Sequence, residues 1–79
     1  MNEHRRAPRY RVMKAGAIEF DGGSAVCVVR DLSITGAGLD VVSPVDIPDH
    51  FTLVLRTEGL HFPCRVAWRS ERQIGVAFE

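Results

Sequence analysis

The N-terminal segment carries the first residues with clear binding chemistry. Within seven positions it contains Arg5, Arg6, Arg9 and Arg11. A guanidinium group can hold a phosphate, grip the O6/N7 edge of guanine or stack on a base. In an extended chain Arg5 and Arg9 lie roughly 13 Å apart, a reach that suits a ligand with more than one anionic group. The segment therefore indicates an anion or nucleotide contact; the alternative is a solvated tail that keeps the protein soluble.

A second polar group lies between two predicted strands, in residues 31–39. Asp31 offers a carboxylate that can accept the N1–H and N2 amino donors of a guanine. Ser33 offers a hydroxyl for a phosphate or for the turn itself, and Gly36 permits close backbone approach. The same residues also fit a purely structural turn, in which Asp31 and Ser33 bond only to nearby backbone.

Charge is distributed unevenly along the 79 residues, although the formal net charge is zero. Residues 1–14 hold five basic side chains against one acidic, and residues 15–79 hold five against nine, which gives +4 and −4. This asymmetry favours an anionic partner for the N-terminal arm. No nucleophile–base pair and no metal-ligand spacing emerges, and so short a chain can barely bury one core. We therefore predict no enzyme activity, no metal and no cofactor.

The cysteines and the apolar runs bear on location. Cys27 and Cys64 fall within apolar runs and are expected to be buried free thiols. No apolar run approaches the roughly 20 residues that span a bilayer, and residues 1–11 lack the apolar stretch of a secretory signal. We therefore expect no membrane span and a cytoplasmic location.

Short strands must position these residues. Apolar and polar residues alternate over residues 60–69, which is the period of a strand with one buried face, and on this pattern Trp68 packs in the core. The predicted strands cover residues 13–20, 24–30, 36–42, 51–55, 60–69 and 74–78. Six short strands with tight turns and no capped helical stripe favour an all-β fold, a small six-stranded antiparallel β-barrel. We expect the barrel over residues 12–79 and a flexible arm over residues 1–11.

Taken together, the two polar groups resemble the paired signature of the PilZ domain family, which comprises bacterial receptors for cyclic di-GMP. The two motifs are Arg5-x-x-x-Arg9 and Asp31-x-Ser33-x-x-Gly36. Residues 37–39 follow the second motif as they often do in the family, and residues 65–69 and 74–78 look like its two closing strands. The resemblance covers residues 5–78 and implies a split-barrel fold without substantial helix.

The resemblance also implies a role for each motif residue. The ligand contacts carry over to Arg5 and Arg9 as clamps with Arg6 as a third, to Asp31 and Ser33 as polar contacts, and to Gly36, which keeps the surface open. Cyclic di-GMP carries two phosphates and two guanines, so it can use both kinds of contact. The arm and the loop must then converge on one side of the barrel. Ligand binding would order the arm and present a new surface to a downstream effector protein.

Two other functions fit part of the sequence. A small-barrel nucleic-acid binder would track a phosphate backbone with its arm, but the body is net acidic and its exposed strand positions lack interleaved aromatic residues for base stacking. We therefore predict no nucleic-acid partner. A PilZ-like protein-interaction module that has lost ligand binding would keep the barrel, and the intact motif residues argue against it. The sequence carries no signal of oligomeric state.

Overall fold

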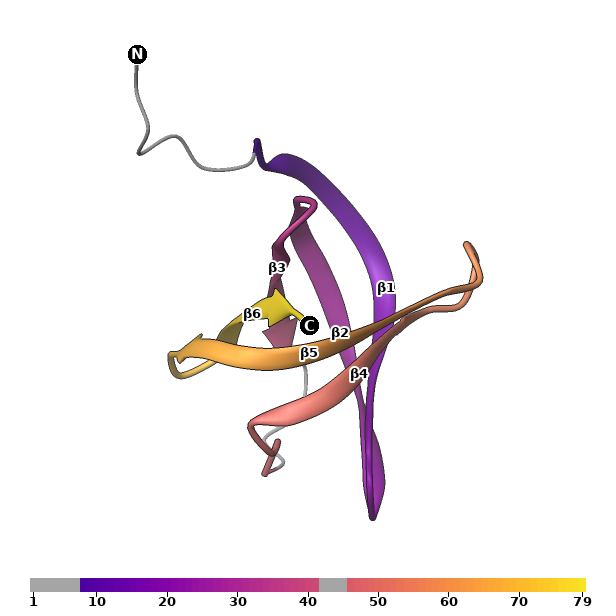
Figure 1. Cartoon of the computed structure of the whole chain (residues 1–79), viewed down its shortest axis with the longest axis vertical. Coiled ribbons are helices and arrows are strands. Elements are labelled where there is room, and N and C mark those ends of the chain that lie inside the picture. The colour runs from indigo at the N-terminus through magenta and orange to yellow at the C-terminus, as the bar shows by residue number, and fades with distance from the viewer. Residues whose placement is uncertain (1–7, 42–45) are drawn as a thin grey trace.

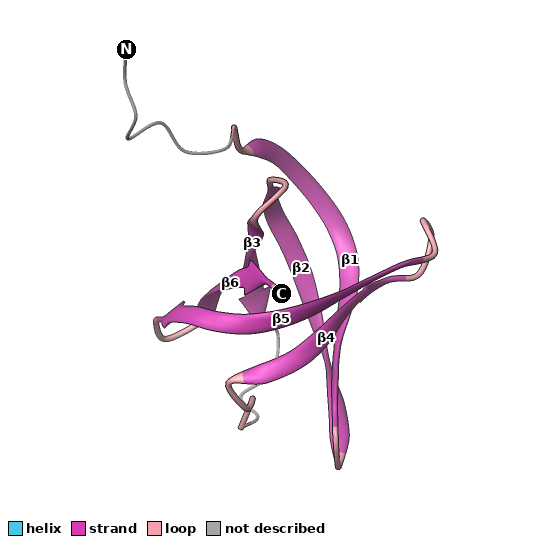
Figure 2. Ribbon diagram, viewed as in Figure 1, coloured by secondary structure: helices cyan, strands magenta, loops and turns pink. Residues whose placement is uncertain are grey.

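The structure, a computed structural model, describes residues 8–41 and 46–79, and within these ranges the chain forms six strands and no helix (Figure 2). The strands are β1 (Tyr10–Phe20), β2 (Gly23–Leu32), β3 (Gly36–Val41), β4 (His50–Leu55), β5 (Leu60–Arg69) and β6 (Gln73–Phe78). The all-β prediction is confirmed, and all six predicted strands are present. No helix in this part of the chain is long and apolar enough to cross a membrane.

The strands close into an antiparallel barrel, as the sequence predicts, and their order around it is β1-β2-β3-β6-β5-β4 (Figure 1). Tight turns join β1 to β2, β2 to β3, β4 to β5 and β5 to β6, so these neighbours in sequence also pair in space. The β3–β6 ladder joins the two halves over five residue pairs. The β1–β4 ladder closes the barrel over residues 17–19 of β1 only.

The core lies inside the barrel, where alternate residues of each strand point inward. The largest fully buried side chains are Ile18, Cys27, Val29, Leu39, Leu53, Leu55 and Cys64. At the edge of this core the rings of Phe62 and Phe78 stack, with centroids 4.5 Å apart. Both cysteines are free and buried, as predicted, and burial raises the pKa of each thiol to about 11.

Register shifts interrupt three strands. They lie between Arg11 and Lys14 in β1, between Val29 and Asp31 in β2, and between Val66 and Trp68 in β5. An extra residue in one strand breaks the in–out alternation and turns the following side chains to the other face. The shift in β5 leaves Trp68 on the outer surface, 49% exposed. The prediction that Trp68 packs in the core is therefore wrong.

The first strand begins earlier than the alternation predicts. Tyr10 pairs with Leu32, and Arg11 pairs with Asp31, so two residues assigned to the arm belong to the β1–β2 ladder. The beginning of β1 thus lies beside the end of β2 (Figure 1). Arg5 and Arg6 lie outside the described residues, as does the predicted strand end at Val42.

Candidate functional site

The pairing register aligns one row of residues across neighbouring strands of the barrel. From β2 through β3 and β6 to β5, the row is Asp31, Gly38, Gly75 and Trp68, with Arg11 of β1 paired to Asp31 at its end. Leu39 and Ile74, the chain neighbours of the two glycines, are buried in the core. The glycines therefore face outward, because successive residues of a strand point to opposite sides of the sheet. We call Asp31, Gly38, Gly75 and Trp68 the glycine row.

Each glycine of this row lies beneath a neighbouring side chain. A Cβ atom at Gly38 would be 2.6 Å from Oδ2 of Asp31, and one at Gly75 would be 2.1 Å from Nε1 of Trp68. Both distances are shorter than real carbon contacts allow, so a side chain at either position would displace its neighbour. The two glycines let the carboxylate and the indole lie close against the sheet. Gly38 and Gly75 are themselves buried beneath these side chains, so the row presents an acceptor at the Asp31 end and an aromatic ring at the Trp68 end.

The carboxylate of Asp31 contacts the guanidinium of an arginine from the first motif. Arg9 donates a hydrogen bond from Nη1 to Oδ1 of Asp31. The two side chains are 52% and 32% exposed, and an ion pair in such surroundings stabilises a protein by about 0–1 kcal/mol. A ligand with its own N–H donors can therefore compete with Arg9 for this carboxylate. At this contact Arg9 of the first motif and Asp31 of the second lie on the same side of the barrel.

Ser33 lies below the surface and holds the turn between β2 and β3. It is 8% exposed, and its Oγ accepts hydrogen bonds from the backbone N–H groups of Thr35 and Gly36, both at 3.2 Å. Its own N–H donates to the carbonyl oxygen of Gly36 at 2.9 Å. These contacts match the structural turn that the sequence offers as the alternative to a ligand contact.

Gly36 is required by the packing of β3 against β6. A Cβ atom there would be 2.1 Å from the carbonyl oxygen of Val76, a backbone atom that cannot rotate away. Next to it, the N–H of Phe78 donates to the carbonyl oxygen of Thr35 at 2.8 Å. The packing of Gly36 against the Val76 backbone fixes the loop against β6, and Gly36 is not part of the glycine row.

The comparison with known families decides the identity of the domain. A family model described as PilZ domain matches residues 3–79, a range that includes both motifs and the whole glycine row. The chain belongs to the PilZ domain family. This is a family of ligand-binding domains that serve as cyclic di-GMP receptors, and the predicted resemblance is confirmed. No curated protein matches the chain.

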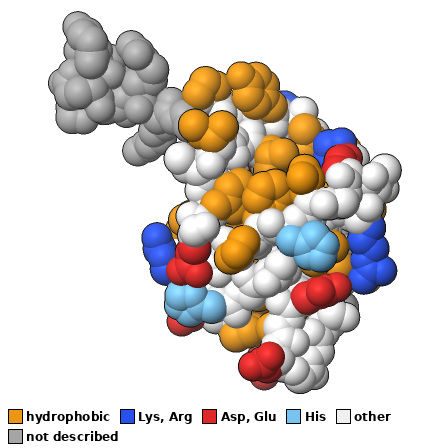
Figure 3. Space-filling model, turned by 45° about the vertical axis from the view of Figure 1, so that its right-hand side comes forward, with side chains coloured by type: hydrophobic (Ala, Val, Ile, Leu, Met, Phe, Trp, Pro, Cys, Tyr) orange, Lys and Arg blue, Asp and Glu red, His pale blue; other side chains and the backbone are white. Residues whose placement is uncertain are grey.

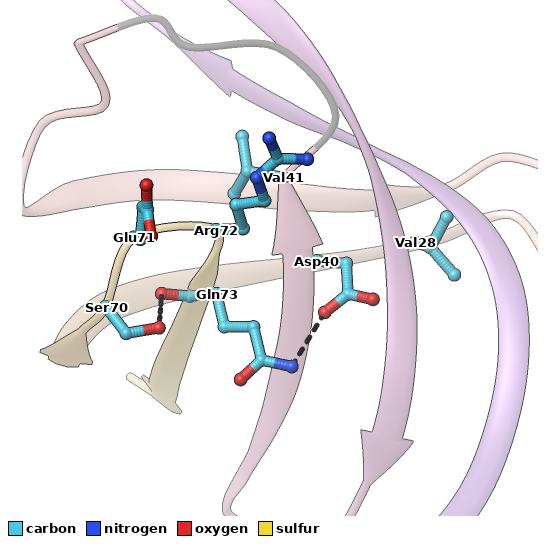
Figure 4. Close-up of a pocket in the computed structure, with 7 residues that line it drawn as sticks. All are labelled: Val28, Asp40, Val41, Ser70, Glu71, Arg72 and Gln73. Carbon is cyan, nitrogen blue, oxygen red and sulfur yellow. Dashed lines mark hydrogen bonds between the residues drawn. The ribbon is translucent and has the colours of Figure 1, made fainter.

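This PilZ domain carries a second carboxylate on the same outer face. Asp40 of β3 accepts hydrogen bonds from Nη1 of Arg30 at 2.9 Å and from Nε2 of Gln73 at 3.1 Å. The hydrogen bond from Arg30 lowers the pKa of Asp40 below its ordinary value, and the same contact raises the pKa of Arg30. Both groups are therefore charged at neutral pH. A pocket lies beside Asp40 and Gln73 (Figure 4).

Sequence reasoning missed the part of the PilZ surface that depends on long-range register. It placed Trp68 inside and gave no role to Gly75. The available signal was the glycine at an outward position in each of two adjacent strands, Gly38 and Gly75, since a glycine inside a strand often marks close approach of another group. Among the described residues, no group of three His, Cys, Asp or Glu side chains is placed to hold a metal ion.

Proposed function

We propose that this PilZ domain binds cyclic di-GMP on the glycine row and signals through its N-terminal arm to an effector protein. The observation that carries the proposal is the contact of Arg9 with Asp31 at one end of an outward row of glycines that Trp68 closes at the other. Cyclic di-GMP matches this surface with guanine N–H donors, phosphates and flat bases.

Asp31 acts as the acceptor for one guanine. Its carboxylate takes the N1–H and N2 amino donors, and hydrogen bonds to an ionised acceptor are about twice as strong as neutral ones. The guanine takes the place of Arg9 on the carboxylate. Arg9, released from Asp31, moves to a phosphate of the same ligand, where its fork matches two oxygens. The exchange keeps both charged groups paired.

Trp68 provides the flat surface that a base needs, and Gly75 lets its indole lie close against the sheet. The indole is half exposed and lies over Gly75, at the end of the row opposite Asp31. Stacking of a base on an aromatic side chain contributes about 1–3 kcal/mol. Trp68 is therefore a second anchor of the ligand, and its fluorescence reports on binding.

The arm supplies the remaining clamps and the output. Arg5 and Arg6 join Arg9 on the phosphates, and the entropy lost in ordering the arm is offset by charge-assisted hydrogen bonds. Ser33 and Gly36 support the ligand indirectly, because they hold the loop that follows Asp31.

The effector reads a surface close to the arm. Tyr10, at the start of β1, and Ile34, in the loop after β2, are large exposed apolar side chains, and Met13 of β1 is a third. Figure 3 shows apolar side chains gathered toward the top of the molecule in that view. Exposed apolar patches of this kind mark protein contacts. The receptor does no catalysis and acts in the bacterial cytoplasm.

The test is a titration with cyclic di-GMP in which binding is measured by calorimetry and by Trp68 fluorescence. We expect Asp31→Ala and Arg9→Ala each to weaken binding at least about tenfold, because each removes a charge-assisted contact. The matched control is Arg56→Ala, which removes an exposed arginine that lies in the turn after β4 and contacts Glu19 of β1. Its affinity should equal that of the unchanged protein. Absence of binding by the unchanged protein, or equal affinity in all variants, would contradict the proposal and favour an interaction module without ligand.

A further inference from the structure

We propose that the pocket beside the glycine row receives the second base of the dinucleotide, and that Asp40 and Gln73 read that base as guanine. The proposal rests on the function proposed above and adds the groups that set its ligand specificity. It concerns residues outside both sequence motifs.

The two polar residues form a row parallel to the glycine row. Asp40 follows Gly38 by two positions on β3, Gln73 precedes Gly75 by two positions on β6, and Asp40 and Gln73 pair across the ladder. Two residues along a strand cover roughly 7 Å, and the side chains of such positions share one face. A ligand on the glycine row therefore has Asp40 and Gln73 within reach of its far side.

The pocket has the size and the chemistry of a base site. Its volume is about 610 Å³, within the range of small-molecule pockets. The lining residues are Val28, Asp40, Val41, Ser70, Glu71, Arg72 and Gln73. Figure 4 shows the side chains of Asp40 and Gln73 directed toward each other, with Ser70 and Arg72 along the neighbouring turn. Acceptors and donors thus surround one opening.

These groups complement guanine and not adenine. A carboxylate has about four acceptor positions, so Asp40 can take the N1–H and N2 amino donors of guanine while it keeps its contacts with Arg30 and Gln73. The guanidinium of Arg72 can donate to the O6 and N7 acceptors. Adenine has neither an N1–H nor an N2 amino group, so it would leave the carboxylate unsatisfied.

The position of Asp40 relative to Asp31 fits the symmetry of the ligand. Asp31 pairs with Gly38, and Asp40 follows Gly38 by two positions, so Asp31 and Asp40 are diagonal neighbours on adjacent strands. Cyclic di-GMP presents two identical guanines, and the face presents two carboxylates. Arg30 directly precedes Asp31 in the sequence and donates a hydrogen bond to Asp40 on the neighbouring strand. It holds Asp40 in place and is a positioning residue.

The experiment compares cyclic di-GMP with cyclic GMP–AMP, in which one guanine is replaced by adenine. Calorimetry on the full chain should show that the unchanged protein binds cyclic di-GMP with an affinity at least about tenfold higher. This is the difference in affinity that one good bidentate contact to a base provides. Asp40→Ala should weaken cyclic di-GMP binding by about the same factor and bring the preference close to one. Asp40→Asn and Gln73→Ala, which change less of the surface, should lower the preference in the same direction. Thermal unfolding checks that each variant is folded.

The outcomes separate the two proposals. If cyclic di-GMP binds and Asp31→Ala weakens it, but Asp40→Ala keeps the original preference, the second-base site is wrong and the receptor function stands. The same holds if the unchanged protein binds both dinucleotides equally. If the unchanged protein binds neither, both proposals fall.

Discussion

Asp31 and Ser33 stand two positions apart in one motif, yet the fold gives them opposite surroundings. Asp31 lies on the outer face with its carboxylate beside Gly38 and in contact with Arg9. Ser33 is buried, and its hydroxyl accepts from the backbone of the turn that it begins. One residue of the motif is therefore available to a ligand, and the other is used by the loop.

The difference shows that one motif can combine residues needed for ligand binding with residues needed for the stability of the loop. Asp31 follows a register shift in β2 that directs its side chain outward, and Ser33 follows the end of that strand. Gly36 belongs with Ser33, because its hydrogen atom faces the backbone of Val76. Substitutions on the outer side should change binding, whereas substitutions in the turn should change stability first.

The largest effect is expected for Gly36→Ala. The new Cβ would be 2.1 Å from the carbonyl oxygen of Val76, so β3 and β6 must separate locally. Forcing a methyl group into a packed site costs about 1–3 kcal/mol, and the backbone clash places this variant at the upper end. Urea unfolding measures the loss. Ser24→Ala, at an exposed position of β2, is the control and should stay within about 0.5 kcal/mol. An unchanged urea midpoint for Gly36→Ala would show that the turn tolerates a side chain.

Asp31→Ala should separate binding from stability. The change removes an exposed carboxylate whose ion pair contributes about 0–1 kcal/mol, so the unfolding midpoint should move little. The affinity for cyclic di-GMP should fall at least about tenfold, because the guanine loses its charged acceptor. Calorimetry and thermal unfolding on the same sample measure both quantities. A large loss of stability would show that Asp31, like Ser33, is a structural residue, and the proposed difference between the two would be wrong.

The sequence predicts the barrel because the in–out alternation is a local property of each strand. The resemblance to the PilZ signature also brings Arg9 and Asp31 into one hypothesis. Trp68 is the instructive failure: the alternation through residues 60–69 points it inward, and the register shift after Val66 turns it outward. The pairing of Gly38 with Gly75 depends on β3 and β6 becoming neighbours in the barrel, and the residue pattern within one strand does not predict its neighbours.

Ser33→Ala tests the loop side of the contrast more gently than Gly36→Ala. It removes the hydroxyl that two backbone N–H groups share, and the loss of such a hydrogen bond costs about 1 kcal/mol. Affinity should fall less than in Asp31→Ala, since the ligand loses only the support of the turn. The informative quantity is the ratio of the two affinity losses. If Ser33→Ala weakens binding as much as Asp31→Ala without loss of stability, its hydroxyl contacts the ligand directly.

The smallest effect concerns Asp40, a second outward carboxylate, which differs from Asp31 in having two donors among the described residues. The hydrogen bond from Arg30 lowers its pKa, so in a carbon-detected NMR titration Asp40 should protonate below its ordinary value of 3.8. Because the folded-state pKa is the lower one, the stabilisation from this pair is present above pH 3.8 and is lost as the pH falls through the folded pKa. Arg30→Ala should return the midpoint toward 3.8, and Gln73→Ala should move it less, since the contact with Gln73 lowers the pKa less than that with Arg30. A midpoint that stays low in Arg30→Ala would assign the shift to another group, and Asp40 would then not depend on Arg30 for its position beside the glycine row.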